Sequence, residues 1–247
     1  MWRTDKYDAP ENPLPDTFAG VSNFLHILDN MITTRPKFRY ENCANGGHFK
    51  GLALARRFTF VTTNDAGAGP TGMLNYRQTY WHNSHVLHPL HLKCDLQAGG
   101  HELNYVLRTC LLGSWLMAMG DGIFHSANYS QHIALYKTRQ RPILRGGDVY
   151  HLLPFPDGKS FEATQFHNPA LRKGSIVIFK PVATLPEALT LPLHGLRRDR
   201  SYQISFQDRH VLDTVVTGAV LMDLGLNITM MAGAEASEVV WLEQLQR

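Results

Sequence analysis

Apolar residues in the first part of the chain follow two alternating kinds of spacing. After Asp16, a residue type typical of a helix start, apolar side chains recur with the spacing of an amphipathic helix as far as Ile32. Residues 38–40 and 58–63 are instead aromatic and β-branched, which is typical of strands, and residues 130–144 again have helical spacing. Strands that alternate with helices indicate a parallel sheet with crossover connections.

The pattern changes around Gly146 and Gly147, where a second part of the chain begins. Beyond this point, short apolar runs are separated by turns rich in proline, glycine and aspartate. The clearest runs are residues 174–180, 201–206, 210–216 and 238–242. Such short strands and turns are typical of an antiparallel β-sandwich. We therefore predict a fold of α/β plus all-β class, with one domain over residues 1–147 and a small β-sandwich domain over residues 148–247.

Composition excludes several classes of protein. The chain has 247 residues, of which 44% are hydrophobic, and this is enough for a sizeable core. Its net charge of +3 is too mild for a nucleic-acid footprint, so we expect no nucleic-acid partner. No apolar run approaches the roughly 18 residues of a membrane span, so we expect no membrane partner. No apolar leader opens the chain, which favours the cytoplasm.

Two aspartates follow strand-like segments. Asp5 follows the short start of the chain, and Asp65 lies in a glycine-rich loop after residues 58–63. In parallel barrels the chemistry gathers at the C-terminal ends of the strands. A pair of carboxyl groups there is what glycoside hydrolysis requires, since one attacks the anomeric carbon and the other protonates the leaving oxygen. Asp65 also fits an ordinary turn, so both interpretations stay open.

Residues 43–47 also have two interpretations. Gly46 and Gly47 would let the backbone approach a ligand closely. Alternatively, the segment is a tight turn between a strand and a helix, and it buries the small thiol of Cys43.

Two further patterns suggest cofactors, and neither fits well. Four histidines recur at every third position before Cys94 and Asp95, but Pro89 would interrupt a helix there, and the spacing exceeds that of usual metal sites. These histidines are His82, His85, His88 and His91. Residues 67–72 satisfy the dinucleotide glycine pattern, but we expect no crossover helix after them. The three cysteines are odd in number and widely spaced, which implies no disulfide framework.

Several motifs in order resemble one enzyme family. Residues 41–47, Glu-Asn-Cys-Ala-Asn-Gly-Gly, resemble the Glu-x-Cys-(Ala/Ser)-x-Gly-Gly motif of glycoside hydrolase family 36, the α-galactosidases of clan D. Residues 2–5 resemble the strand-four motif that carries the nucleophile, and residues 60–66 stand where the family has its acid/base segment. Residues 77–91 match the strand-seven segment of the family, and residues 136–152 match its last helix with the linker. Residues 193–226 match the strands of its C-terminal domain.

The resemblance implies a fold and a reaction. A complete (β/α)8 TIM barrel takes roughly 250 residues, so this chain would hold only about strands four to eight of one, followed by the β-sandwich. The implied activity is that of a retaining α-glycoside hydrolase, α-galactosidase-like, which removes terminal α-linked galactose from an oligosaccharide or glycoside without a cofactor. We also expect exposed sheet edges and an apolar inner face on the isolated chain, weak or absent activity in isolation, and a homo-oligomer as one option for the full-length enzyme.

The resemblance also implies roles for individual residues. Asp5 would be the nucleophile and Asp65 the acid/base. Substrate contacts would come from Arg3, Cys43, Gly46, Gly47 and Asn64. Arg3 stands where the family has a lysine, and a planar guanidinium is not equivalent to an ammonium group. Two alternatives therefore stay open: a clan D glycosidase for a different sugar, and a non-catalytic carbohydrate-binding or structural module.

Overall fold

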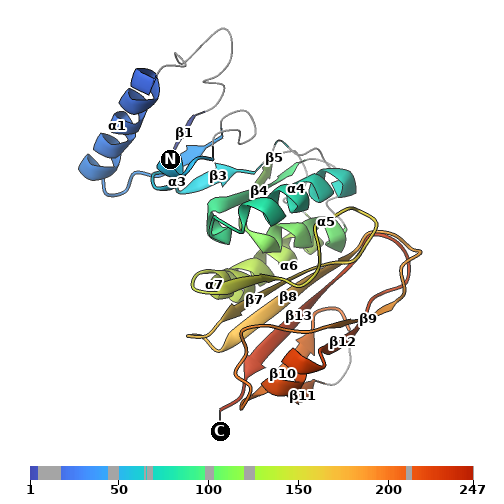
Figure 1. The fold of residues 1–247 in the computed structure, drawn as a ribbon. Coiled ribbons are helices and arrows are strands. Elements are labelled where there is room, and N and C mark those ends of the chain that lie inside the picture. Colours follow the sequence, from blue (N-terminus) through green and yellow to red (C-terminus); the bar gives the residue numbers. More distant parts are fainter. Residues whose placement is uncertain are drawn as a thin grey trace.

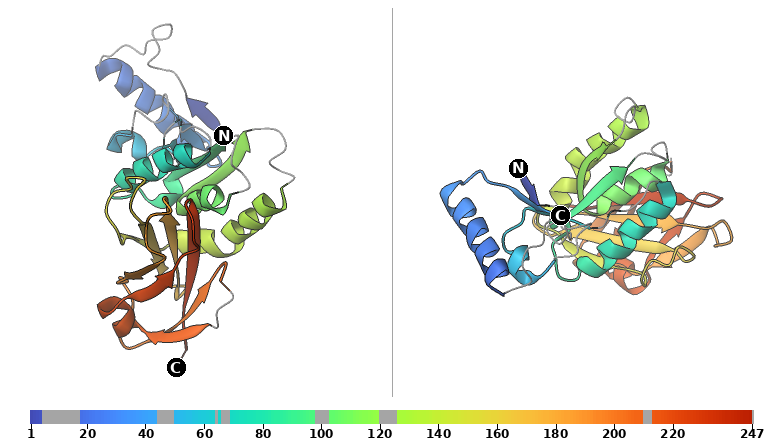
Figure 2. Two further views of the ribbon diagram at one scale, coloured as in Figure 1. Left: turned by 90° about the vertical axis from the view of Figure 1, so that its right-hand side faces the viewer. Right: turned by 90° about the horizontal axis from the view of Figure 1, so that it is seen from above.

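The computed structural model describes residues 1–4, 18–43, 50–63, 65, 69–97, 103–119, 126–209 and 213–246. In Figure 1 a parallel sheet, a layer of helices, a large antiparallel sheet and a small two-stranded sheet follow one another through the molecule. The N-terminus lies in the parallel sheet, and the last described residues lie at the far end of the antiparallel sheet (Figures 1 and 2).

The parallel sheet consists of five short strands in chain order. They are β1 (Trp2–Thr4), β2 (Tyr40–Asn42), β3 (Phe60–Thr62), β4 (Leu92–Gln97) and β5 (Ser114–Met119). The connections contain α1 (Phe18–Thr34), α3 (Leu52–Ala55), α4 (Gly69–Asn83), η1 (Pro89–His91), α5 (Asn104–Thr109) and η2 (Cys110–Leu112). All neighbouring strands are parallel, which confirms the predicted α/β arrangement of this part.

A continuous helical segment leads from β5 to the antiparallel part. It comprises α6 (Ala127–Leu135), η4 (Tyr136–Gln140) and α7 (Arg141–Leu144). Ser126 begins it as an N-cap, because its hydroxyl accepts a hydrogen bond from the backbone N–H of Tyr129. The helices α4 to α7 lie between the two large sheets (Figure 1).

The second part of the chain is antiparallel. Its large sheet has the order β11-β10-β13-β8-β7-β6, and β9 pairs with β12 in a separate two-stranded sheet. The strands are β6 (Asp148–His151), β7 (Glu162–Asn168), β8 (Lys173–Lys180), β9 (Ala188–Leu191), β10 (Ser201–Phe206), β11 (Thr214–Thr217), β12 (Leu226–Thr229) and β13 (Ala236–Gln244), and α8 (Gly218–Asp223) follows β11. Antiparallel β structure was the predicted class for this part, and it is confirmed.

The central strands of the large antiparallel sheet, β7, β8 and β13, are buried on both faces. On β8, Val177 and Phe179 pack toward the helix layer, whereas Ile176 and Ile178 pack toward the small sheet. The same alternation on β13 directs Trp241 to the helix layer. Because successive side chains of a strand point to opposite faces, a strand covered on both sides has a continuous apolar sequence. For this reason β8 and β13 can be recognised as apolar runs in the sequence.

A buried arginine connects the helix layer to the antiparallel sheet. Arg77 of α4 forms an ion pair with Glu162 of β7, donates to the hydroxyls of Tyr105 and Thr109, and lies over the ring of Phe179. Arg77 and Glu162 are 2% and 5% exposed, so neither charge is solvated and each depends on the other.

Two local predictions are wrong. The segment 77–91 does not hold a strand: α4 extends to Asn83, η1 follows, and the strand begins at Leu92. A crossover helix, α4, does begin at Gly69, within the glycine pattern. Both errors arise because the buried face of α4 includes Arg77, which interrupts the expected apolar stripe.

A disulfide that the sequence did not imply joins two buried cysteines. Cys94 on β4 and Cys110 in η2 are bonded, 16 residues apart, and Cys43 is free. The bond forms because η2 leads directly into β5, the neighbour of β4 in the sheet. Among the described helices, none has the length and apolar character needed to cross a membrane.

Candidate functional site

The C-terminal edge of the parallel sheet brings the predicted site segments together. β1, β2 and β3 are paired so that Thr4 lies beside Asn42, and Asn42 beside Val61. The C-terminal ends of these three strands therefore lie at one edge of the sheet. Cys43 follows β2, and Asp65 comes shortly after β3.

Charged side chains form a row across one face of this sheet. Glu41 lies at the centre of the row, and its Oε1 accepts hydrogen bonds from Lys93 Nζ at 2.6 Å and from Thr62 Oγ1 at 3.4 Å. Arg3 Nη1 is 3.7 Å from the same oxygen, and Lys93 Nζ is also 2.7 Å from Asp95 Oδ2. Anionic and cationic groups thus alternate over β1, β2 and β4. We call Arg3, Glu41, Lys93 and Asp95 the charged row.

The charged row lies on the face away from the helix layer. On β4, Leu92, Cys94 and Leu96 belong to the apolar core, and Lys93 and Asp95 alternate with them. The expectation of an apolar inner face is therefore wrong for the described residues of β1, β2 and β4, where Arg3, Glu41, Lys93 and Asp95 lie on this face. Its polar groups satisfy one another, which explains how Glu41 remains only 2% exposed.

Burial and ion pairing have opposite effects on the charges of the row. Burial alone would lower the pKa of Lys93, but hydrogen bonds to Asp95 and Glu41 outweigh it and hold the pKa above its ordinary value. Burial raises the pKa of Asp95, and Lys93 only partly offsets this. Lys93 therefore stays cationic between two carboxyl groups.

Two of the predicted substrate contacts lie side by side. Arg3 Nη2 donates to Cys43 Sγ at 2.9 Å. Cys43 is fully buried, whereas the side chain of Arg3 is 39% exposed. The thiol thus fixes one end of the guanidinium while the rest of it stays accessible at the sheet edge. Their roles toward a substrate remain a prediction.

A half-buried lysine, Lys50, adds a further donor beside the acid/base segment. Lys50 Nζ donates to the carbonyl oxygen of Thr63 at 2.6 Å, and Thr63 Oγ1 donates to the carbonyl oxygen of Lys93 at 3.0 Å. Burial lowers the pKa of Lys50 to about 8. Asp65, two residues after Thr63, is exposed. The predicted Asp5, Gly46, Gly47 and Asn64 lie outside the described residues.

Glu41, Lys93 and Asp95 are the residues that sequence reasoning missed as a site. The alternation of charged and apolar residues over 92–96 is the signal that would have found them. Chemically, the two accessible members of the row, Arg3 and Asp95, offer a donor and an acceptor, which suits a neutral ligand with hydroxyl groups.

The four histidines that recur at every third position make contacts with other rings. His85 stacks on His151 with ring centroids 4.8 Å apart, and both rings contact Trp81. His88 and His91 pair elsewhere, and Cys94 is in the disulfide. Within the described part of the chain, no three histidine, cysteine or acidic side chains are grouped as metal ligands would be.

Comparisons with known proteins show similarity to one family of glycosidases. Residues 162–242 match the glycosyl hydrolase family 36 C-terminal domain. The family 36 α-galactosidase AgaB from Geobacillus stearothermophilus is similar in structure, with a TM-score of 0.77 and 18% identity over 99% of this chain and 35% of its own. A variant of AgaA from the same organism, in complex with stachyose, is also similar, with a TM-score of 0.79 and 18% identity over 99% of this chain and 35% of its own.

An α-galactosidase from Lactobacillus brevis is also similar, with a TM-score of 0.74 and 16% identity over 92% of this chain and 31% of its own. The comparison with curated proteins gave no match. The chain thus spans about a third of the length of these solved structures. The resemblance to family 36 that the sequence indicated is confirmed.

Proposed function

We propose that this chain is the C-terminal part of a retaining α-glycoside hydrolase that removes terminal α-linked galactose. The observation that carries the proposal is the charged row, which lies beside the strand ends that lead to Asp5 and Asp65. The match of residues 162–242 to the C-terminal domain of family 36 supports the same assignment.

The parallel sheet is proposed to be about strands four to eight of a (β/α)8 barrel, with a domain boundary between residues 147 and 148. Five parallel strands in chain order with intervening helices support this proposal. Inner faces of barrels are lined by alternate residues of each strand, and β4 directs Lys93 and Asp95 to such a face. The strands that would close the barrel would cover this polar face.

In the proposed mechanism, Asp5 attacks the anomeric carbon and forms a covalent glycosyl ester. Asp65 protonates the leaving oxygen and then removes a proton from the water that hydrolyses the ester. This chemistry needs carboxyl groups about 5–5.5 Å apart. Arg3, two residues before Asp5, is held by Cys43 and Glu41 at the sheet edge, and its charge would favour the ionised form of Asp5.

Galactose as the sugar rests on the neighbours, some of which were solved with raffinose and stachyose. Both ligands are neutral oligosaccharides, and Arg3 and Asp95, the accessible members of the charged row, offer a donor and an acceptor for hydroxyl groups. The proposed contacts are Arg3, Cys43, Gly46, Gly47 and Asn64. Because Arg3 presents a planar fork, we expect it to bridge two adjacent hydroxyl groups of the sugar.

The test is turnover by the full natural protein with two single substitutions. Asp5→Asn and Asp65→Asn should each lower hydrolysis of 4-nitrophenyl α-D-galactoside by at least about 10³-fold, because each removes one of the two required carboxyl groups. Asp199→Asn is the matched control, since Asp199 is an exposed aspartate in the antiparallel part. Hydrolysis of a different aryl α-glycoside would reassign the sugar. Unchanged activity in both variants would refute the mechanism and favour the non-catalytic alternative.

A further inference from the structure

A third carboxyl group, that of Asp95, lies on the face of the parallel sheet that the proposed mechanism uses. The charged row has accessible ends and a buried middle. The side chains of Arg3 and Asp95 are 39% and 28% exposed, whereas those of Glu41 and Lys93 are 2% and 5% exposed. Asp95 is thus the accessible anion of the row, and the contacts proposed above assign it no particular hydroxyl group.

The register of the strands places Asp95 toward the proposed acid/base. Lys93 of β4 is paired with Thr62, the last residue of β3. Asp95 comes two residues after Lys93, and Asp65 comes three residues after Thr62. Because each residue of a parallel strand advances by about 3.3 Å, Asp95 lies about 7 Å beyond the level at which β3 ends, on the side toward Asp65.

The pairing of β4 with β5 is irregular directly after Asp95. Asp95 is paired with Leu116, but Gln97 is paired with Met119, so β5 has one extra residue over this interval. An extra residue bends a strand and changes the direction of the side chains beside it, and such irregularities are common next to active sites. Regular pairing of the two strands therefore ends at the level of Asp95.

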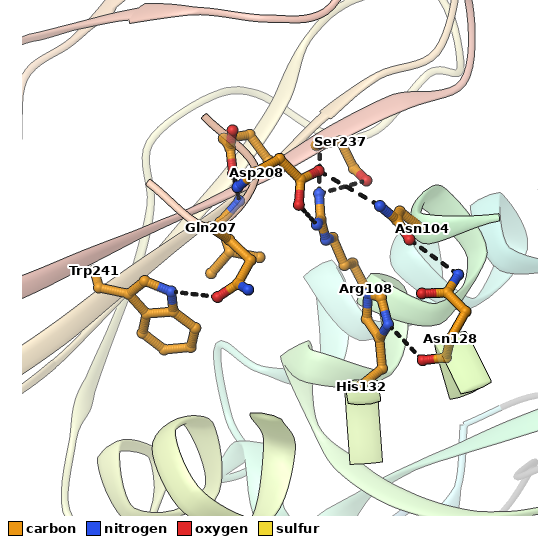
Figure 3. A network of polar contacts seen from close by, with 10 residues as sticks. Asn104, Arg108, Asn128, His132, Gln207, Asp208, Ser237 and Trp241 are labelled. Carbon is orange, nitrogen blue, oxygen red and sulfur yellow. Dashed lines mark hydrogen bonds and ion pairs between the residues drawn. The ribbon is translucent and has the colours of Figure 1, made fainter. Parts of the chain in front are cut away.

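The charge of Lys93 does not require Asp95. Arg108, which is also buried, is paired within the described part of the chain with one carboxylate, that of Asp208 (Figure 3). Lys93 Nζ has two carboxylates, with Glu41 Oε1 at 2.6 Å and Asp95 Oδ2 at 2.7 Å. Since the buried Glu41 already pairs with Lys93, Asp95 adds a second anion, and Lys93 fixes its carboxylate before a ligand arrives.

An accessible carboxylate held in this way is an acceptor for the hydroxyl groups of a sugar. Lys93 occupies one of its oxygens, and a carboxylate can accept several hydrogen bonds, so capacity remains for a ligand. We propose that Asp95 accepts a hydrogen bond from one particular hydroxyl group of the sugar unit that is cleaved, and so contributes to the choice of sugar. The inference rests on the proposed function, which supplies the sugar as the ligand.

The test measures how much each hydroxyl group of the sugar contributes to binding. Methyl α-D-galactoside and its 2-, 3-, 4- and 6-deoxy analogues are titrated calorimetrically into the full natural protein carrying Asp5→Asn, which suppresses turnover. The series is repeated after Asp95→Ala is added, and after Asp199→Ala is added as the matched control at an exposed aspartate. Thermal unfolding shows whether each variant is folded, and Asp95→Asn, which keeps the shape of the side chain, replaces Asp95→Ala if that variant is not.

We expect the loss of one hydroxyl group to weaken binding by at least about tenfold in the Asp5→Asn protein, and by less than about threefold once Asp95→Ala is added. The losses for the other three hydroxyl groups should be the same in both proteins, and Asp199→Ala should change none of them. Losses that Asp95→Ala leaves unchanged, losses that it reduces alike at all four positions, or no binding of the galactoside would each overturn the inference.

The two proposals fail in different ways. Unchanged losses in a protein whose turnover depends on Asp5 and Asp65 would refute the role of Asp95 alone. The expected pattern of losses together with full turnover by Asp5→Asn would support the role of Asp95 and refute the proposed mechanism.

Discussion

Arg77 and Glu162 form an ion pair between the two parts of the chain, with Nε 2.5 Å from Oε2 and Nη2 3.2 Å from Oε1. The two residues are 85 positions apart, on α4 and β7. The pair is surrounded by Tyr105 and Phe179, whose rings lie under the guanidinium. It therefore couples the helix layer to the antiparallel sheet by charge as well as by apolar packing.

Removing the charge of Glu162 should be costly. Glu162→Gln leaves the buried guanidinium of Arg77 without its anion, so we expect the free energy of unfolding to fall by roughly 3–5 kcal/mol. Urea unfolding followed by circular dichroism measures the change. The matched control is Asp223→Asn, which breaks the exposed pair with Arg198 and should have no measurable effect. Equal effects of the two substitutions would show that burial of the pair is not what matters.

The disulfide predicts a definite number of reactive thiols. Unfolded without reductant, the chain should titrate one thiol, that of Cys43, and after reduction all three. Cys110→Ser should lower the free energy of unfolding by about 3 kcal/mol, the value expected for a closed loop of roughly 15 residues. Three thiols in the unreduced chain would contradict the pairing of Cys94 with Cys110.

Lys50 should react as an unusually acidic lysine. Its pKa of about 8, lowered from 10.5 by burial, means that half of its amines are neutral near pH 8. Competitive acetylation with acetic anhydride, followed by mass spectrometry, should give a rate for Lys50 that rises with a midpoint near that pH. Lys137, exposed on η4, is the comparison within the same sample. A rate for Lys50 that rises only in the ordinary range of lysines would show that its amine is solvated.

His151 should make stability depend on pH. Burial, with a smaller contribution from His85, lowers the pKa of His151 from 6.5 to about 4. Between these values the unfolded chain binds a proton that the folded chain does not, so the free energy of unfolding falls as pH falls through this window. His151→Gln should make this dependence shallower in urea unfolding at several pH values, and His26→Gln, at an exposed position of α1, should not. A slope unchanged by His151→Gln would contradict the buried neutral ring.

Parts of the fold are predictable from the sequence because burial there is continuous. The apolar runs predict β8 and β13 to within two residues, since both faces of these strands are covered. The helix α4 is not predictable in this way. Its buried face includes Arg77, whose charge is tolerated only because Glu162 reaches it from far along the chain, and a local pattern carries no sign of such a partner.

The sequence predicts which segments form the candidate site, but it does not predict most of the side-chain contacts within it. The motifs place Arg3 and Cys43 near each other, and the two side chains are in contact. Glu41 binds Lys93 from 52 residues away, and this depends on the parallel register of β2, β3 and β4. Register depends on the hydrophobic pattern of all the paired strands and on the geometry of their connections, so the local sequence reveals the charges without revealing that they meet.

The most direct test of the account is rescue by azide of the full natural protein in which Asp5 or Asp65 is replaced by glycine. With an activated aryl α-D-galactoside, Asp5→Gly plus azide should form β-galactosyl azide, because the anion attacks the anomeric carbon from the side that the nucleophile has left. Asp65→Gly should instead form α-galactosyl azide, because azide intercepts the covalent intermediate on Asp5. Proton NMR distinguishes the two anomers. The same anomer from both variants, or no azide product from either, would contradict the assignment of Asp5 and Asp65 as the catalytic pair.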